Sequence, residues 1–134
     1  MLTYSEIFSG LSAHLDPDVL LDFSATFTCG ADFRVRDVHR FVCIEVADDF
    51  SVWVPLYSHH GPGRQRLPKS GRTGCLAWRA GIYYWHLAQR WIASHAGVIA
   101  AAEAANERTR PGNRDRLSAA SVAKMLAVSS RSAA

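Results

Sequence analysis

Residues 38–57 read Val-His-Arg-Phe-Val-Cys-Ile-Glu-Val-Ala-Asp-Asp-Phe-Ser-Val-Trp-Val-Pro-Leu-Tyr, and this stretch carries most of the information about the fold. Its two apolar runs, Val38–Ala47 and Ser51–Tyr57, are rich in the β-branched and aromatic residues that favour strands. Asp48-Asp49 lies between the runs, where a short polar pair is typical of a tight hairpin. The stretch therefore predicts two antiparallel strands.

The residues before this stretch predict a short helix and then a strand. Thr3 and Glu6 have capping-box spacing ahead of apolar residues at helical intervals, which favours a helix over about residues 4–14. Asp16-Pro17-Asp18 would end that helix. From Val19 to Cys29 apolar and polar residues alternate, as they do in a half-buried strand.

The residues after this stretch predict a short strand over Thr73–Arg79 and then two helices. Ile82 to Arg108 contains no Pro, is rich in Ala and repeats apolar residues at helical period, which predicts a long helix. A shorter helix is expected over Ser118–Val128, followed by a flexible tail over residues 129–134.

This order of elements favours the α+β class. The expected fold is a small, strongly curved antiparallel sheet or barrel with a short N-terminal helix and a long C-terminal helix. A chain of 134 residues is expected to form a single domain, here over residues 1–128.

The sequence predicts a cytoplasmic protein without membrane contact. No apolar run approaches the roughly 18 residues that a membrane helix needs, and the N-terminus lacks the basic and apolar regions of a signal peptide. Cys29, Cys43 and Cys75 are odd in number and widely spaced, so they predict buried free thiols and neither disulfides nor a metal pair.

Charge is distributed unevenly along the chain. Residues 1–49 hold nine acidic and three basic residues, a net charge of −6, whereas residues 50–134 hold twelve basic and three acidic residues, a net charge of +9. This division predicts a polyanionic partner or an acidic protein that covers the basic half.

Four basic residues share a Gly- and Pro-rich segment, residues 59–72, which we call the basic loop. They are Arg64, Arg66, Lys69 and Arg72. A basic loop at the end of a strand can hold phosphate groups, and Arg does so with two hydrogen bonds at once. These side chains are therefore predicted to bind nucleic acid; the alternative is a solvated surface loop.

The basic loop begins with His59-His60, two candidates for proton transfer near neutral pH. Neighbouring residues of an extended chain point to opposite sides, which favours the alternative of two ordinary exposed histidines. The other histidines show no spacing typical of a metal site, so neither a metal nor another cofactor is predicted; they are His14, His39, His86 and His95.

The aromatic residues Tyr83, Tyr84, Trp85 and Trp91 have two interpretations. They could stack on nucleic-acid bases. The favoured alternative is packing against the sheet, with Tyr83 and Trp85 in a second layer or a homodimer interface.

Two short segments resemble the MazF/PemK family of endoribonuclease toxins. That family has a His-Arg pair that opens an apolar strand, as at His39-Arg40, and a later Val-Pro strand end followed by Ser or Thr, as from Val54-Pro55 to Ser58. The resemblance implies an SH3-like barrel and an antitoxin partner. It also implies that Arg40 stabilises the pentavalent phosphorane, that Ser58 contacts the scissile phosphate, and that the basic loop guides single-stranded RNA.

The expected function is nucleic-acid binding and, by this resemblance, metal-independent cleavage of single-stranded RNA. The candidate catalytic residues are Arg40, Ser58, His59 and His60. The alternative is a non-enzymatic regulator or inhibitor of phage or plasmid type, which binds nucleic acid or an acidic protein surface through the basic loop.

Overall fold

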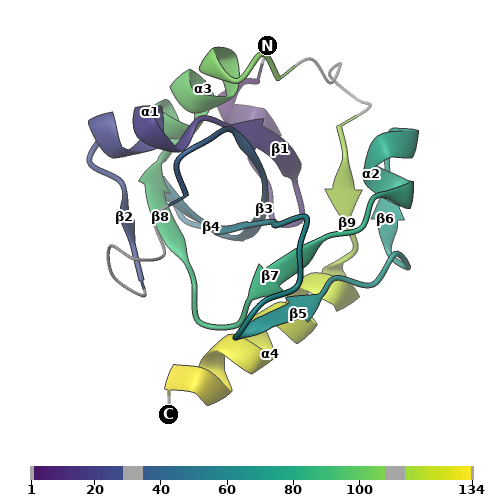
Figure 1. The fold of residues 1–134 in the computed structure, drawn as a ribbon. Coiled ribbons are helices and arrows are strands. Elements are labelled where there is room, and N and C mark those ends of the chain that lie inside the picture. The colour runs from purple at the N-terminus through teal and green to yellow at the C-terminus, as the bar shows by residue number, and fades with distance from the viewer. Residues whose placement is uncertain (1, 29–34, 108–113, 134) are drawn as a thin grey trace.

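The computed structural model describes residues 2–28, 35–107 and 114–133 and has a five-stranded antiparallel sheet at its centre (Figure 1). The strands, in spatial order, are β1 (Ser12–Leu15), β3 (His39–Val46), β4 (Phe50–Pro55), β8 (Trp91–Ser94) and β2 (Thr26–Phe27). Within the described residues β1 and β2 are not paired with each other, so the sheet stays open. The α+β class and the antiparallel sheet are confirmed, whereas the closed SH3-like barrel is not formed.

β3 and β4 form the predicted hairpin. Val42 lies directly opposite Val54 in the antiparallel register. The turn at Asp48-Asp49 is closed by the backbone N–H of Ala47, which donates to the carbonyl of Phe50 at 2.8 Å. This pair of strands supplies side chains to both faces of the sheet.

One face of the sheet packs against two helices. Phe41, Trp53 and Trp91 are fully buried there, beneath α1 (Pro17–Asp22) and α3 (His95–Ala104). Figure 1 shows the two helices side by side at this face.

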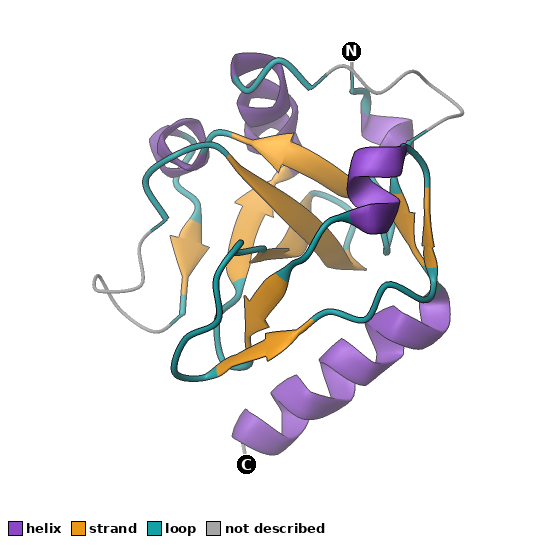
Figure 2. Ribbon diagram, turned by 45° about the vertical axis from the view of Figure 1, so that its right-hand side comes forward, coloured by secondary structure: helices purple, strands orange, loops and turns teal. Residues whose placement is uncertain are grey.

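The other face packs against smaller elements. A second core cluster joins Val42 and Val54 with Trp78, Trp85 and Met125. These elements are two strand pairs and two helices: β5 (Arg64–Arg66) with β7 (Tyr84–His86), β6 (Arg72–Thr73) with β9 (Arg116–Leu117), α2 (Leu76–Ala80) and α4 (Ala119–Ala133). Figures 1 and 2 both show α4 running beneath β5 and β7.

The N-terminal segment differs from the prediction. A single 3₁₀ turn, η1 (Tyr4–Glu6), stands where a helix over residues 4–14 was predicted, because Ser12–Leu15 pairs with β3. The strand predicted over 19–29 forms only in part, because Thr26–Phe27 is β2 whereas the first part of the span lies in α1; Cys29 is outside the described residues. Asp16 caps α1, with Oδ1 accepting from the backbone N–H of Asp18 at 3.0 Å, and Pro17 suits the first helical position. Asp16-Pro17 therefore starts a helix and does not end one.

The long helix predicted over 82–108 is wrong. β7 and β8 occupy its first half, and only the ten residues of α3 are helical in the described part of the span. Trp91 pairs with Trp53 in the sheet, a long-range interaction that overrides the helical period. Ser94 then caps α3, its Oγ accepting from the backbone N–H of Gly97 at 3.1 Å.

The remaining predicted elements are shifted. The segment 73–79, predicted as a strand, contains the end of β6 and most of α2. The helix predicted over 118–128 corresponds to α4, which continues to Ala133 through residues predicted as a tail. Among the described residues, no helix has both the length and the apolar character needed to cross a membrane.

Candidate phosphate-binding pocket

A pocket of about 310 Å³ lies where β1, the start of β3, the segment after β4 and the segment before β7 meet. We call it the Arg40 pocket. It brings together Arg40 and Ser58 from the predicted site, whereas His59 and His60 are exposed and do not line it. The lining residues are His14, Val38, His39, Arg40, Leu56, Ser58 and Tyr83.

The Arg40 guanidinium is held in the wall of this pocket. The residue is 7% exposed, and its Nη1 donates to Asp115 Oδ2 at 2.8 Å and to Ser12 Oγ at 3.1 Å. Its guanidinium carbon lies 5.1 Å from the centre of the Trp78 ring. Arg40 Nε is buried without a hydrogen-bond partner in the described residues, so the group retains an unused donor.

Asp115, the partner of Arg40, is itself fixed by a close backbone contact. Its Oδ1 accepts from the backbone N–H of Cys75 at 2.8 Å. Gly74 has φ of +132°, and a Cβ there would lie 2.8 Å from Asp115 Cα, so only glycine allows this approach. Asp115 is therefore held by the backbone N–H of Cys75 as well as by Arg40, which keeps the buried ion pair in one position.

Cys43 and Cys75 do not line the Arg40 pocket. Cys43 is buried as predicted, and burial raises the pKa of its thiol to about 12. Cys75 is exposed, so the prediction of a buried thiol is wrong at that position.

Two histidines outside the predicted site line the Arg40 pocket. His39 Nδ1 lies 2.6 Å from the carbonyl oxygen of Asp37. Because a carbonyl can only accept, Nδ1 carries the proton and the neutral ring has its lone pair on Nε2. His14 Nδ1 lies 3.2 Å from Glu107 Oε2, and an ionised carboxylate selects the same tautomer. His14 also sits directly opposite Arg40 in the β1–β3 pairing.

Among the four basic residues of the loop, Arg72 has a structural role. Arg72 is 6% exposed and donates to four carbonyl oxygens, those of Leu67 at 2.7 Å, Trp78 at 2.9 Å, Pro68 at 3.2 Å and Gly81 at 2.6 Å. Burial lowers the pKa of its guanidinium. Arg72 therefore fixes the path of the loop and is not the phosphate ligand that the sequence predicted.

The other basic residues of the loop are more accessible to solvent than Arg72. Arg66 and Lys69 are exposed, and Arg64 is half-buried with its guanidinium carbon 3.7 Å from the centre of the Tyr57 ring. The ring of His39 meets Tyr57 edge-on at 5.7 Å. Tyr57 thus connects the basic loop to the Arg40 pocket.

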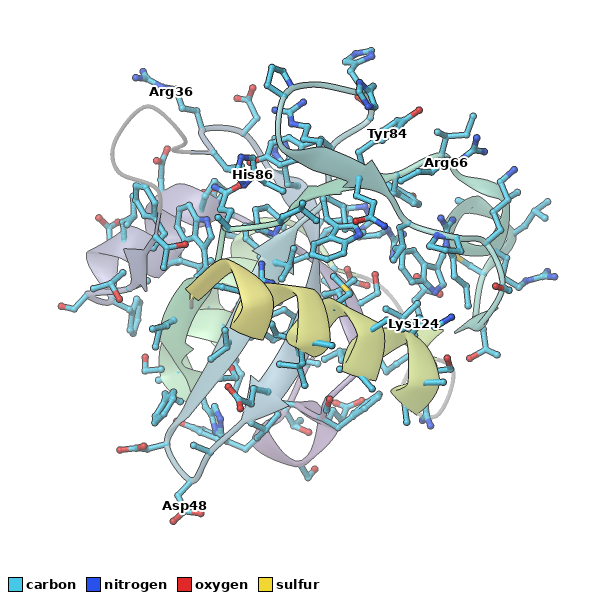
Figure 3. The ribbon with its side chains drawn as sticks, turned by 90° about the horizontal axis from the view of Figure 1, so that it is seen from below. Arg36, Asp48, Arg66, Tyr84, His86 and Lys124 are labelled. Atoms are coloured by element: carbon cyan, nitrogen blue, oxygen red, sulfur yellow. The ribbon has the colours of Figure 1, made fainter. Side chains whose placement is uncertain are left out.

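β5 and β7 present basic and aromatic side chains on one face. Arg66 lies opposite Tyr84 (Figure 3), and the strand register places Arg64 opposite His86. The His60 ring meets Tyr84 edge-on at 5.5 Å. Arginines interleaved with an aromatic ring suit single-stranded nucleic acid, in which bases stack and phosphates seek cations. The other aromatic candidates lie elsewhere, with Trp85 and Trp91 in the core and Tyr83 at the Arg40 pocket.

In the part of the chain that the structure describes, no group of three or more His, Cys, Asp or Glu side chains is arranged to hold a metal ion. Comparison with protein-family models, curated proteins and solved structures finds no match. The resemblance to MazF/PemK toxins therefore stays a prediction, and function has to be argued from the pocket.

Proposed function

We propose that this protein is an endoribonuclease that binds single-stranded RNA at the Arg40 pocket and cleaves it without a metal ion. The observation that supports this best is one pocket lined by two histidines of defined tautomer and a fixed arginine. The reaction needs a base, an acid and a cation beside the phosphorane, and these three side chains have the matching chemistry.

In the proposed reaction, His39 Nε2 takes the proton of the 2′-hydroxyl, and the 2′-oxygen forms a bond to the adjacent phosphorus. The bond from phosphorus to the 5′-oxygen then breaks, and protonated His14 gives its proton to that oxygen. The products are a 2′,3′-cyclic phosphate and a 5′-hydroxyl end. We assign the acid role to His14 because its partner is the carboxylate of Glu107, which can pair with an imidazolium, whereas the partner of His39 is a neutral carbonyl.

Arg40 and Ser58 would contact the non-bridging phosphate oxygens. Asp115 offsets the charge of Arg40 but holds its guanidinium in one position, and a fixed donor stabilises a transition state without reorganisation. Attraction of the RNA strand would then come from the exposed Arg66 and Lys69 and from the half-buried Arg64.

The test is incubation of purified protein with a labelled RNA oligonucleotide in EDTA. The expected product carries a 2′,3′-cyclic phosphate, detected by mass spectrometry. The matched control is the same oligonucleotide with 2′-O-methyl groups throughout, which lacks the nucleophile and should stay intact. Uncut RNA in EDTA, or cleavage of the methylated control, would contradict the proposal.

The second candidate function is nucleic-acid binding without cleavage. It is favoured by the face that carries Arg64, Arg66 and Tyr84, which needs no histidine chemistry. A binding constant whose logarithm falls steeply with the logarithm of salt concentration, with the RNA recovered intact, would select it.

A further inference from the structure

A second pocket, of about 100 Å³, lies between the basic loop and α4, and we call it the α4 pocket. It shares no lining residue with the Arg40 pocket. Its lining residues are Gln65, Arg66, Leu67, Pro68, Ser70, Trp85, Ser121, Lys124 and Met125.

The two walls of the α4 pocket are fastened to each other. Ser118, just before α4, donates its backbone N–H to the carbonyl of Gly71 at 2.8 Å. Arg72 pairs with Leu117 between β6 and β9, and its side chain holds the carbonyls of the loop wall. The pocket is therefore preformed, which lowers the entropy lost when a ligand binds.

The floor of the α4 pocket is apolar and its rim is cationic. Leu67, Trp85 and Met125 are each no more than 4% exposed and form the floor. Arg66 on the β5 side and Lys124 on the α4 side are exposed at the rim (Figure 3). None of the lining residues is acidic, so the site suits a ligand with a flat apolar ring and an attached anion.

The volume restricts the size of that ring. About 100 Å³ holds several water molecules or one six-membered ring, and it is well below the roughly 300 Å³ of pockets for drug-sized ligands. The hydroxyls of Ser70 and Ser121 and the amide of Gln65 offer donors and acceptors for polar ring edges. We propose that the α4 pocket binds a pyrimidine nucleotide, with the base on the apolar floor and the phosphate between Arg66 and Lys124.

The test is calorimetric titration of the full chain with uridine 5′-monophosphate, ribose 5-phosphate and adenosine 5′-monophosphate. Burial of the single-ring base predicts that the uridine nucleotide binds about tenfold tighter than either of the others. Loss of one cation, in Lys124→Ala or Arg66→Ala, should weaken the binding of uridine 5′-monophosphate about tenfold. Arg36→Ala is the matched control, because this exposed cation does not line the pocket and its loss should change affinity less than about twofold.

Equal affinity for uridine 5′-monophosphate and ribose 5-phosphate would overturn the proposal, as would equal effects of Arg36→Ala and Lys124→Ala. A further variant, Ser70→Tyr, places a bulky side chain at an exposed position of the rim and should abolish binding while the protein remains folded. Unchanged affinity in that variant would also overturn it.

The nucleotide bound here has two possible sources, a free nucleotide or one residue of an RNA strand. Titration with a short oligouridylate distinguishes them. Affinity within a few-fold of the mononucleotide supports a free nucleotide, and at least about hundredfold tighter binding that still depends on Lys124 supports RNA. The proposal does not rest on RNA cleavage, since nucleotide binding should persist in a variant that lacks His39.

Discussion

The Arg40 pocket and the α4 pocket use neighbouring residues of one segment, because Tyr83 lines the first and Trp85 the second. They place charge in opposite ways. In the first, the arginine is buried and ion-paired, and both histidines have defined hydrogen-bond partners. In the second, two exposed cations stand above an apolar floor.

This difference between the pockets corresponds to the different requirements of catalysis and of ligand binding. Proton transfer and charge stabilisation need groups held within a fraction of an ångström, and defined hydrogen-bond partners favour that precision. Binding of a ring with a phosphate needs apolar area and mobile cations at the rim. The two pockets should therefore respond to different substitutions.

The largest expected effect is on RNA cleavage. His39→Asn and His14→Asn each keep an amide N–H near the position of the ring Nδ1 but remove the Nε2 nitrogen. Each should lower the cleavage rate by about 10²- to 10⁴-fold, the usual contribution of a general acid or base. Nucleotide affinity at the α4 pocket should stay unchanged in the same calorimetric titration.

The matched control for these variants is His60→Asn, since His60 is exposed and outside the Arg40 pocket. Its cleavage rate should stay within a few-fold of the original protein. If His60→Asn were as slow as His39→Asn, the reacting phosphate would not lie in the Arg40 pocket, and the contrast between the pockets would fail.

The next largest effect is on the free energy of unfolding, and it is tested by comparing variants of Arg72 and Arg66. A lysine ammonium cannot reach the four carbonyls that Arg72 satisfies, so Arg72→Lys should lower the free energy of unfolding by about 3 kcal/mol. Arg66→Lys keeps an exposed charge and should change it by less than about 0.5 kcal/mol. Urea unfolding measures both. Equal losses would mean that the carbonyl contacts of Arg72 contribute little.

The comparison of these two arginines also shows what sequence can predict. Both stand in one Gly- and Pro-rich basic loop, and nothing in the local pattern separates them. Arg72 becomes buried because residues 78 and 81, beyond the loop, bring carbonyls to it. Local composition indicated a basic, exposed loop, and Arg66 and Lys69 are exposed. It could not indicate that the Arg72 side chain would be buried and would hold the loop in place.

The fold, too, was predictable only where the sequence signals are local. The β3–β4 hairpin was predictable because its signals are local, with two apolar runs around Asp48-Asp49. β1 and β8 were missed because each becomes a strand by pairing with a distant partner, and Ser12–Leu15 in particular carries no strong strand signal.

The candidate site was predictable only in part. Arg40 and Ser58 were selected through the resemblance to a toxin family, and the structure places both at one pocket. His14 could not be selected, because it reaches that pocket only through the β1–β3 pairing and its partner is the distant Glu107. His39 stood beside Arg40 in the sequence, and this adjacency was the one available signal.

The smallest expected effect concerns pH and the ribbon formed by β5 and β7. Burial lowers the pKa of His86 below its ordinary value near 6.5, and the charges of Arg64 and Arg90 lower it further. The unfolded chain therefore takes up this proton at a higher pH than the folded protein does. The stability that neutral His86 provides is fully present above about pH 6.5, and it is lost as pH falls through the lower pKa of the folded state.

Replacing His86 tests this directly. In urea unfolding between about pH 8 and pH 5, the free energy of unfolding of His86→Gln should fall less steeply with acidification than that of the original protein. Gln65→Asn, at an exposed position of the same ribbon, is the control, because it changes no titratable group and should leave the slope as it is. Since Arg64 faces His86 across the ribbon and also stacks on Tyr57, protonation of His86 should loosen the basic loop. Identical slopes in the original protein and His86→Gln would show that the ribbon does not sense pH through this ring.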